Sequence, residues 1–207
     1  MRTKFMIALG LSFLFSAATV NAIPIVSVDA DPFTPGVQSF FAYMPGDTLT
    51  IDVVIEGVEV DAGPFGSSNP PVNGPLHTFE FDLDYDPTIL SATSITSGGF
   101  LGSFFPYGTA LLVPWDINAP DINYAEMTLG FGGVSGDGVL ASITFDTIGV
   151  GTSILDLNDV VLSAPFGNPM NVALNDASVA PVPEPGTLLL LGYGLVGLAA
   201  RRRWLKR

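Results

Sequence analysis

The chain has 207 residues, a high apolar content and few charges, most of them negative. It holds 20 Asp and Glu against seven Lys and Arg, which gives a formal net charge of −13, and it holds no cysteine. The lack of cysteine excludes disulfides, thiolate metal sites and thiol nucleophiles. Every Lys and Arg lies near one end of the chain, whereas the acids lie between Asp29 and Glu184. The central region therefore cannot neutralise phosphates, which excludes binding to nucleic acid.

The first predicted element is a secretory signal peptide over residues 1–22. Two cations near the start precede an apolar stretch from Phe5 to Phe15. Val20 and Ala22 supply small residues at the two positions that signal peptidase reads, so we place cleavage after Ala22. An uncleaved membrane anchor is the alternative, but the apolar stretch is too short to span a bilayer comfortably.

Residues 23–180 are predicted to form one all-β domain. Nine strand-like runs are separated by Gly, Pro, Asn and Asp, without an amphipathic helix of ten or more residues between them. Many short strands in one domain favour an antiparallel sandwich. The runs are Ile25–Val28, Thr48–Ile55, Thr78–Tyr85, Ile89–Ile95, Ala110–Val113, Tyr124–Phe131, Val139–Phe145, Ser153–Leu162 and Asn171–Val179.

Two glycine-rich segments punctuate these runs. Gly57–Pro75 is the longest stretch without strand character, and we expect a mobile loop there, with a functional loop as the alternative. Gly132-Gly133 and Gly136-Asp137-Gly138 predict a short hairpin-like connection, because glycine permits the backbone conformations that tight turns need.

The sharpest candidate site in the domain is a run of carboxylates at alternate positions, Glu80, Asp82, Asp84 and Asp86. On a strand this spacing places all four on one face, and the apolar residues between them enter the core. Same-face neighbours lie about 7 Å apart, so one ion would bind at most two of them. We name Asp84 and Asp86 as the candidate pair for Ca²⁺, which accepts flexible sets of oxygen ligands. The alternative, which we favour, is a solvated acidic face without metal.

Aromatic residues form a second group of candidates. Tyr107 and Trp115 stand in a region of weak strand character. Exposed aromatic side chains stack on sugars or anchor protein partners, so these two could contact a glycan or a protein. A core position is the alternative, and Phe40-Phe41-Ala42-Tyr43 has the same two interpretations.

The residues give little support for catalysis. His77 is the single histidine, and neither a Gly-x-Ser-x-Gly elbow nor a His-Glu-x-x-His motif occurs. Two carboxylates can hydrolyse a glycoside, but only at a defined separation that sequence alone does not reveal. We therefore predict a protein that is not an enzyme, with a carboxylate-based glycosidase as the least favoured alternative.

The last predicted element is a membrane-sorting tail over residues 181–207. An apolar run from Pro185 to Ala200 is followed at once by Arg201, Arg202 and Arg203. As a helix the run would cover about 24 Å, slightly less than the ~30 Å hydrocarbon core, and snorkelling arginines can absorb that mismatch. Because cations near a membrane helix stay on the cytoplasmic side, we expect the domain to lie outside the cell.

The tail also resembles a known sorting signal. Pro183-Glu184-Pro185, then a short Leu- and Gly-rich helix, then Arg201-Arg202-Arg203 is similar to the PEP-CTERM signal of exopolysaccharide-producing bacteria. This resemblance implies that an exosortase, an integral-membrane transpeptidase-like enzyme, recognises the Pro-Glu-Pro motif and removes the tail. It also implies a cell-envelope protein that is anchored first and then released to the cell surface or the extracellular matrix.

The domain resembles a cohesin. Four segments carry the resemblance in cohesin order: Pro45–Ile51, Phe79–Leu90, Gly136–Phe145 and Asn158–Leu162. The resemblance implies a nine-stranded jelly-roll sandwich, related in fold to some carbohydrate-binding modules. It further implies a dockerin-like protein or a polysaccharide as the extracellular partner. A carbohydrate-binding module that uses Tyr107 or Trp115 is the alternative function.

Overall fold

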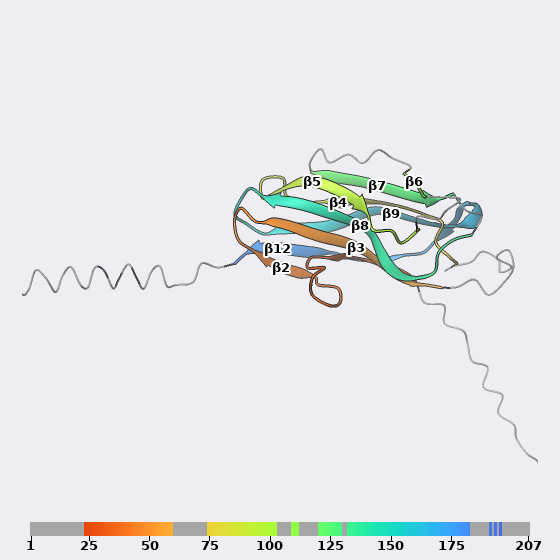
Figure 1. The fold of residues 1–207 in the computed structure, drawn as a ribbon, viewed down its shortest axis with the longest axis horizontal. Coiled ribbons are helices and arrows are strands. Elements are labelled where there is room, and N and C mark those ends of the chain that lie inside the picture. Colours follow the sequence, from red (N-terminus) through yellow and green to blue (C-terminus); the bar gives the residue numbers. More distant parts are fainter. Residues whose placement is uncertain are drawn as a thin grey trace, which may run out of the picture.

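The computed structural model describes residues 23–59, 74–102, 109–111, 120–129 and 132–182, together with residues 191, 193 and 195. Within these residues the chain forms a sandwich of two β-sheets (Figure 1). The strands are β1 (Ile25–Asp29), β2 (Phe40–Tyr43), β3 (Thr48–Val58), β4 (Thr78–Asp84), β5 (Leu90–Ser97), β6 (Thr109–Leu111), β7 (Asp121–Thr128), β8 (Gly136–Thr147), β9 (Ser153–Ala164), β10 (Asn168–Met170), β11 (Ala173–Asn175) and β12 (Ala177–Pro181). A 3₁₀ turn, η1 (Pro165–Gly167), joins β9 to β10.

One sheet has five strands in the order β11-β1-β3-β8-β5, and the other has seven. The seven-stranded sheet has the order β2-β12-β9-β4-β7-β6, with β10 paired to β9. Neighbouring strands are antiparallel except in two pairs, β1 with β11 and β2 with β12, which are parallel. These parallel pairs bring the first and last strands of the domain together in both sheets.

The core follows from the period-two pattern of the strands. In β4, Phe79, Phe81 and Leu83 are fully buried, and the polar residues between them face outward. Phe79, Phe81 and Tyr124 form an aromatic cluster with ring centroids 5.9 to 6.2 Å apart. Because each such ring removes about 150–250 Å² from water, this cluster anchors β4 and β7 to the opposite sheet.

The predicted all-β sandwich is confirmed, but the described residues form twelve strands instead of about nine. Phe40–Tyr43 is a strand that the sequence analysis treated only as an aromatic group. The predicted strand Asn171–Val179 is divided in two, because the chain passes from one sheet to the other at Asp176. The Asp176 side chain fixes the chain at the point where it changes sheets, since its Oδ1 accepts a hydrogen bond from the backbone N–H of Leu157 at 3.0 Å.

The hairpin-like connection predicted between Gly132-Gly133 and Gly136-Asp137-Gly138 is wrong, because the strands on either side of it, β7 and β8, lie in different sheets. Gly138 lies opposite Ile55 of β3, and a Cβ at this position would stand 2.5 Å from the Phe100 ring. Gly138 is thus needed for close packing within a strand.

The predicted Gly57–Pro75 loop begins later than expected, because β3 continues to Val58. Gly57 has a φ of +77°, which glycine adopts without strain, and its N–H donates to Oδ1 of Asp137 at 2.7 Å. Residues 60–73, which form most of that segment, lie outside the described residues.

Candidate binding surfaces

The outer face of the seven-stranded sheet gathers carboxylates around its central strand β4. Glu80, Asp82 and Asp84 point to this face, as the alternation in the sequence predicts. In the register of the sheet, Asp84 lies directly between Asp121 of β7 and Asp156 of β9. Opposed residues in antiparallel strands have Cβ atoms about 4.5–5.5 Å apart, where like charges repel. We call Asp121, Asp84 and Asp156 the acidic row.

Two asparagines on the same face take the place that Lys or Arg would otherwise fill. The Asn123 side-chain amide donates to Oδ1 of Asp82 and, at 3.4 Å, to Oε1 of Glu80. The Asn158 amide donates to Oδ2 of Asp84 at 3.0 Å. An amide satisfies an acceptor without adding positive charge, so this face stays negative.

Apolar side chains lie along the same face beside these charges. Val161 and Ile154 of β9 and Phe40 of β2 are each more than half exposed. Val161 lies opposite Glu80, whereas Ser178 lies between Ile154 and Phe40 in register. Exposed apolar side chains rimmed by polar groups mark interaction sites. We call this whole surface, with the acidic row at one end, the acidic face.

The segment Phe40–Tyr43 contains both an exposed aromatic residue and a core aromatic residue, the two interpretations that its sequence allowed. Phe40 is exposed on the acidic face, whereas Tyr43 is buried and belongs to the core. The Tyr43 hydroxyl donates to the backbone carbonyls of Gly151 at 2.9 Å and Gly149 at 3.2 Å. Alternation along a strand explains the difference, because adjacent residues face opposite ways.

The predicted metal pair, Asp84 and Asp86, spans the end of β4. Asp84 is the last residue of the strand, and Asp86 starts a turn in which its Oδ1 accepts the hydroxyl and N–H of Thr88 at 2.6 and 2.8 Å. The hydroxyl and then the amide of Thr88 lower the pKa of Asp86. Over the described part of the chain, no three His, Cys, Asp or Glu side chains are grouped so as to hold a metal ion. The calcium site stays a prediction.

One buried carboxylate, that of Glu126, was not predicted from the sequence. Glu126 of β7 lies between the sheets and is only 4% exposed. Its Oε1 accepts the Tyr124 hydroxyl at 2.6 Å, and its Oε2 accepts the Ser97 hydroxyl at 3.1 Å, from β5 of the other sheet. Burial, together with the hydrogen bond to Glu126 and its charge, raises the pKa of Tyr124. Alternation offered a signal, because Ile122, Tyr124 and Glu126 must share one face of β7.

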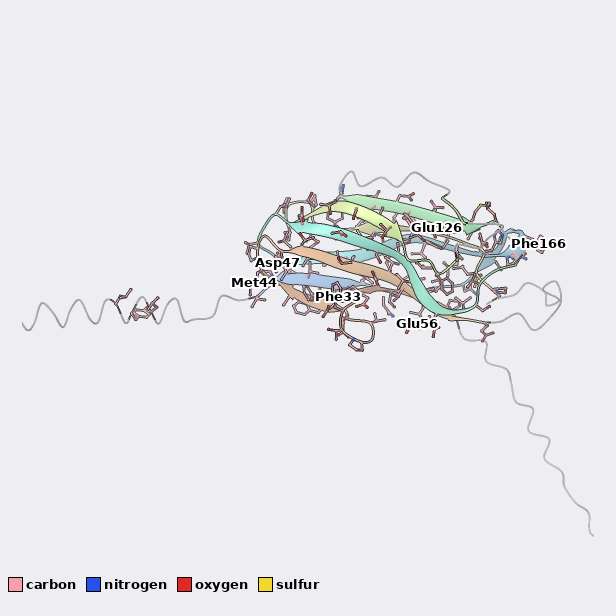
Figure 2. The ribbon with its side chains drawn as sticks, in the orientation of Figure 1. Phe33, Met44, Asp47, Glu56, Glu126 and Phe166 are labelled. Atoms are coloured by element: carbon pink, nitrogen blue, oxygen red, sulfur yellow. The ribbon has the colours of Figure 1, made fainter. Side chains whose placement is uncertain are left out.

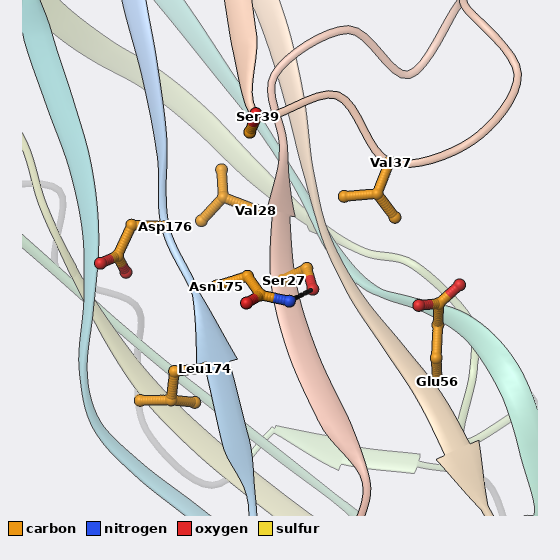
Figure 3. A pocket seen from close by; sticks show the side chains of 8 residues that line it. All are labelled: Ser27, Val28, Val37, Ser39, Glu56, Leu174, Asn175 and Asp176. Atoms are coloured by element: carbon orange, nitrogen blue, oxygen red, sulfur yellow. Dashed lines mark hydrogen bonds between the residues drawn. The ribbon is translucent and has the colours of Figure 1, made fainter.

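A groove of about 600 Å³ lies where the chain crosses between the sheets (Figure 3). Within it, the Asn175 amide donates to the Ser27 hydroxyl at 3.1 Å. The carboxylate of Asp176 accepts a hydrogen bond from the Leu157 N–H. Two carboxylates and no cation make the groove unsuited to anionic ligands. It is lined by Ser27, Val28, Val37, Ser39, Glu56, Leu174, Asn175 and Asp176.

The remaining predicted site residues lie outside the described residues. They are Tyr107 and Trp115, the motif residues Pro183, Glu184 and Pro185, and the basic residues Arg201, Arg202 and Arg203. Leu191, Tyr193 and Leu195 of the tail are described, and all three are helical and exposed. Among the residues with a described structure, no helix has the length and apolar character needed to cross a membrane.

Residues 181–203 match the sequence profile of the PEP-CTERM protein-sorting motif. No curated protein sequence matches the chain. Solved structures of cohesins share its fold. A non-cellulosomal cohesin from the archaeon Archaeoglobus fulgidus has a TM-score of 0.54 at 16% identity, covering 80% of this chain and 96% of the cohesin.

Two further cohesin structures give similar values. The seventh ScaB type I cohesin from Pseudobacteroides cellulosolvens has a TM-score of 0.57 at 13% identity, covering 79% of this chain and 94% of its own. A type I cohesin–dockerin complex from Clostridium thermocellum has a TM-score of 0.54 at 14% identity, covering 78% and 100%. At such identities the similarity establishes the fold.

Proposed function

With a PEP-CTERM motif behind a cohesin-fold domain as the premise, we propose that this chain is an exported, non-enzymatic interaction protein of the cell envelope. Its tail inserts in the membrane as a helix until an exosortase removes it at Pro183-Glu184-Pro185. Its domain, freed of the signal peptide, binds a partner outside the cell. The motif match at residues 181–203, which begins at the last residue of β12, is the observation that carries this proposal.

The acidic face is the binding surface that we propose for the partner. It combines the acidic row with amide donors and the exposed side chains of Phe40, Ile154 and Val161. Because the chain has no Lys or Arg between residues 5 and 200, charge complementarity calls for a partner with basic residues. A dockerin-like protein is the first choice, by analogy with the cohesin–dockerin complex of the same fold.

Binding to the host's own extracellular matrix tests this surface. We expect the purified protein to bind matrix material in a salt-sensitive way, and Asp84→Lys to weaken binding at least tenfold. Asp146→Lys is the matched control, because Asp146 pairs with Thr48 and Ser91 on the other sheet. Equal losses in both variants would refute the acidic face as the binding surface.

The mass of the protein recovered from its host tests the sorting step. A C-terminus near Pro183 is the expected result, together with an N-terminus after Ala22. A mature chain that still ends at Arg207 would refute removal of the tail, although it would leave an anchored interaction protein.

A carbohydrate-binding module is the second candidate, favoured by the exposed ring of Phe40 on the acidic face. Aromatic rings stack on the apolar faces of sugars, and Tyr107 and Trp115 are the further aromatic candidates that the sequence predicts. An array of purified matrix glycans separates the two functions. Glycan binding that falls with Phe40→Ala favours the module, whereas no glycan binding favours a protein partner. Hydrolysis of a glycan would instead revive the glycosidase alternative.

A further inference from the structure

Three exposed apolar side chains surround the point where the chain leaves the domain. Met44 is 64% exposed, Ile148 61% and Val150 74%, although all three stand in loops bound to the core. Val182, the residue before Pro183-Glu184-Pro185, is held to the domain by a hydrogen bond from its N–H to the carbonyl of Tyr43 at 2.7 Å. We call Met44, Ile148 and Val150 the C-terminal rim.

The rim is a fixed part of the fold, because two residues tie its loops together. The Thr147 hydroxyl accepts the N–H of Gly46 at 2.8 Å and donates to the carbonyl of Asp47 at 2.9 Å. The Tyr43 hydroxyl binds the carbonyls of the loop that carries Val150. Figure 2 shows Met44 and Asp47 at the end of the sandwich where β12 finishes, and Phe166 at the opposite end.

The distance between the rim and the apolar tail is short. Only Pro183 and Glu184 separate Val182 from the apolar run that starts at Pro185. Fully extended, this connection spans at most about 11 Å. The headgroup layer takes up roughly 5–7 Å of that distance. An inserted tail therefore holds this end of the domain at the bilayer surface.

We infer that the C-terminal rim rests on the interfacial layer of the membrane while the tail is inserted. The inference rests on the proposed membrane insertion of the tail. The partner is a zwitterionic lipid surface, because the rim offers apolar contacts and no cation, and the nearby Asp47 and Asp146 would be repelled by anionic headgroups. Transfer from water into this layer is favourable for apolar side chains and is not favourable for acidic ones.

The lack of cysteine makes the test direct, because a single introduced thiol can be labelled without removing others. The full chain is reconstituted in phosphatidylcholine vesicles with a polarity-sensitive fluorophore on Val150→Cys, and brominated lipid is the quencher. Phe166→Cys is the matched control, since Phe166 is 78% exposed at the far end. Leu191→Cys reports insertion of the tail.

We expect lipids brominated near the headgroup to quench Val150→Cys at least threefold more than Phe166→Cys, and deep bromines to quench Leu191→Cys. A ten-residue Gly-Ser insertion between Val182 and Pro183 should abolish the quenching at Val150→Cys and leave Leu191→Cys unchanged. Replacing half of the lipid with phosphatidylglycerol should reduce quenching at Val150→Cys.

The labels also separate the two possible failures. Quenching at Leu191→Cys with equal, weak quenching at Val150→Cys and Phe166→Cys would overturn the rim contact alone. No quenching at Leu191→Cys would overturn tail insertion, and the rim contact with it.

Discussion

Glu126 and Asp84 are carboxylates on neighbouring strands of one sheet, and neither has a Lys or Arg to pair with, yet their surroundings differ completely. Glu126 faces the other sheet and is bound by two hydroxyls, from Tyr124 and Ser97. Asp84 faces solvent between two further carboxylates and is bound by the Asn158 amide. Between the sheets, one carboxylate, that of Glu126, is surrounded by hydroxyl donors. On the outer face, the carboxylate of Asp84 lies among other carboxylates. The first arrangement stabilises the fold, whereas the second leaves repulsion that a basic partner would relieve.

Truncating the buried carboxylate should have the largest effect on stability. Glu126→Ala leaves the hydroxyls of Tyr124 and Ser97 without their acceptor and opens a cavity between the sheets. We expect a loss of about 3 kcal/mol in the free energy of unfolding, measured by urea denaturation. Glu126→Gln is the control, because it keeps the size and one acceptor oxygen, and it should cost less than about 1 kcal/mol. Equal losses in both variants would show that charge, and not hydrogen bonding and packing, decides stability here.

Alkaline pH should lower stability through Tyr124. Its pKa is raised in the folded state, so the folded protein keeps a proton that the unfolded chain releases near pH 10. The stabilisation is complete below pH 10 and is lost as the pH rises further, by about 1.4 kcal/mol per pH unit for one such group. Tyr124→Phe should reduce this loss of stability with rising pH. Part of the loss should persist, because burial also raises the pKa of Tyr85. Urea midpoints between pH 8 and 11 measure this, and an unchanged slope in Tyr124→Phe would contradict it.

On the acidic face, removing a carboxylate should raise the free energy of unfolding, whereas removing Glu126 should lower it. Asp84→Asn keeps an acceptor for Asn158 and ends the repulsion with Asp121 and Asp156, so we expect a gain of up to about 1 kcal/mol. The gain should shrink in 1 M salt, where the Debye length falls to about 3 Å. Thermal unfolding at low and high salt measures both effects.

Asp146→Asn on the five-stranded sheet is the control for that gain. Oδ1 of Asp146 accepts the Thr48 hydroxyl at 2.8 Å, and its neighbours in register are Thr48 and Ser91. Because no carboxylate lies directly opposite, this substitution should leave stability within about 0.5 kcal/mol. A similar gain on both faces would mean that net charge, and not the acidic row, sets the repulsion.

These contrasts show which parts of the fold could be predicted from the sequence. Alternation in β4 placed Phe79 and Phe81 inside and Asp82 outside, because local period decides the face of a strand. Register could not be predicted, since it depends on pairing between strands that are distant in sequence. The acidic row is a product of register, and the hydrogen bond from Ser97 to Glu126 is a product of the packing of one sheet on the other. For the same reason the sequence pairs Asp84 with Asp86, two residues along the chain, although the carboxylates nearest in register are Asp121 and Asp156.

Added calcium should give the smallest change. If the acidic face is solvated, Ca²⁺ and Mg²⁺ at equal ionic strength screen the acidic row alike. The melting temperature should then differ between them by less than about 1 °C, below the roughly 2–4 °C that 1 kcal/mol gives in a domain of this size. A larger rise that is specific to Ca²⁺ would instead reveal a site, and three variants would locate it. Loss of the rise in Asp84→Asn and Asp86→Asn would identify the predicted pair. Loss in Asp84→Asn and Asp156→Asn, with Asp86→Asn unaffected, would place the ion across the strands, where register brings the carboxylates together.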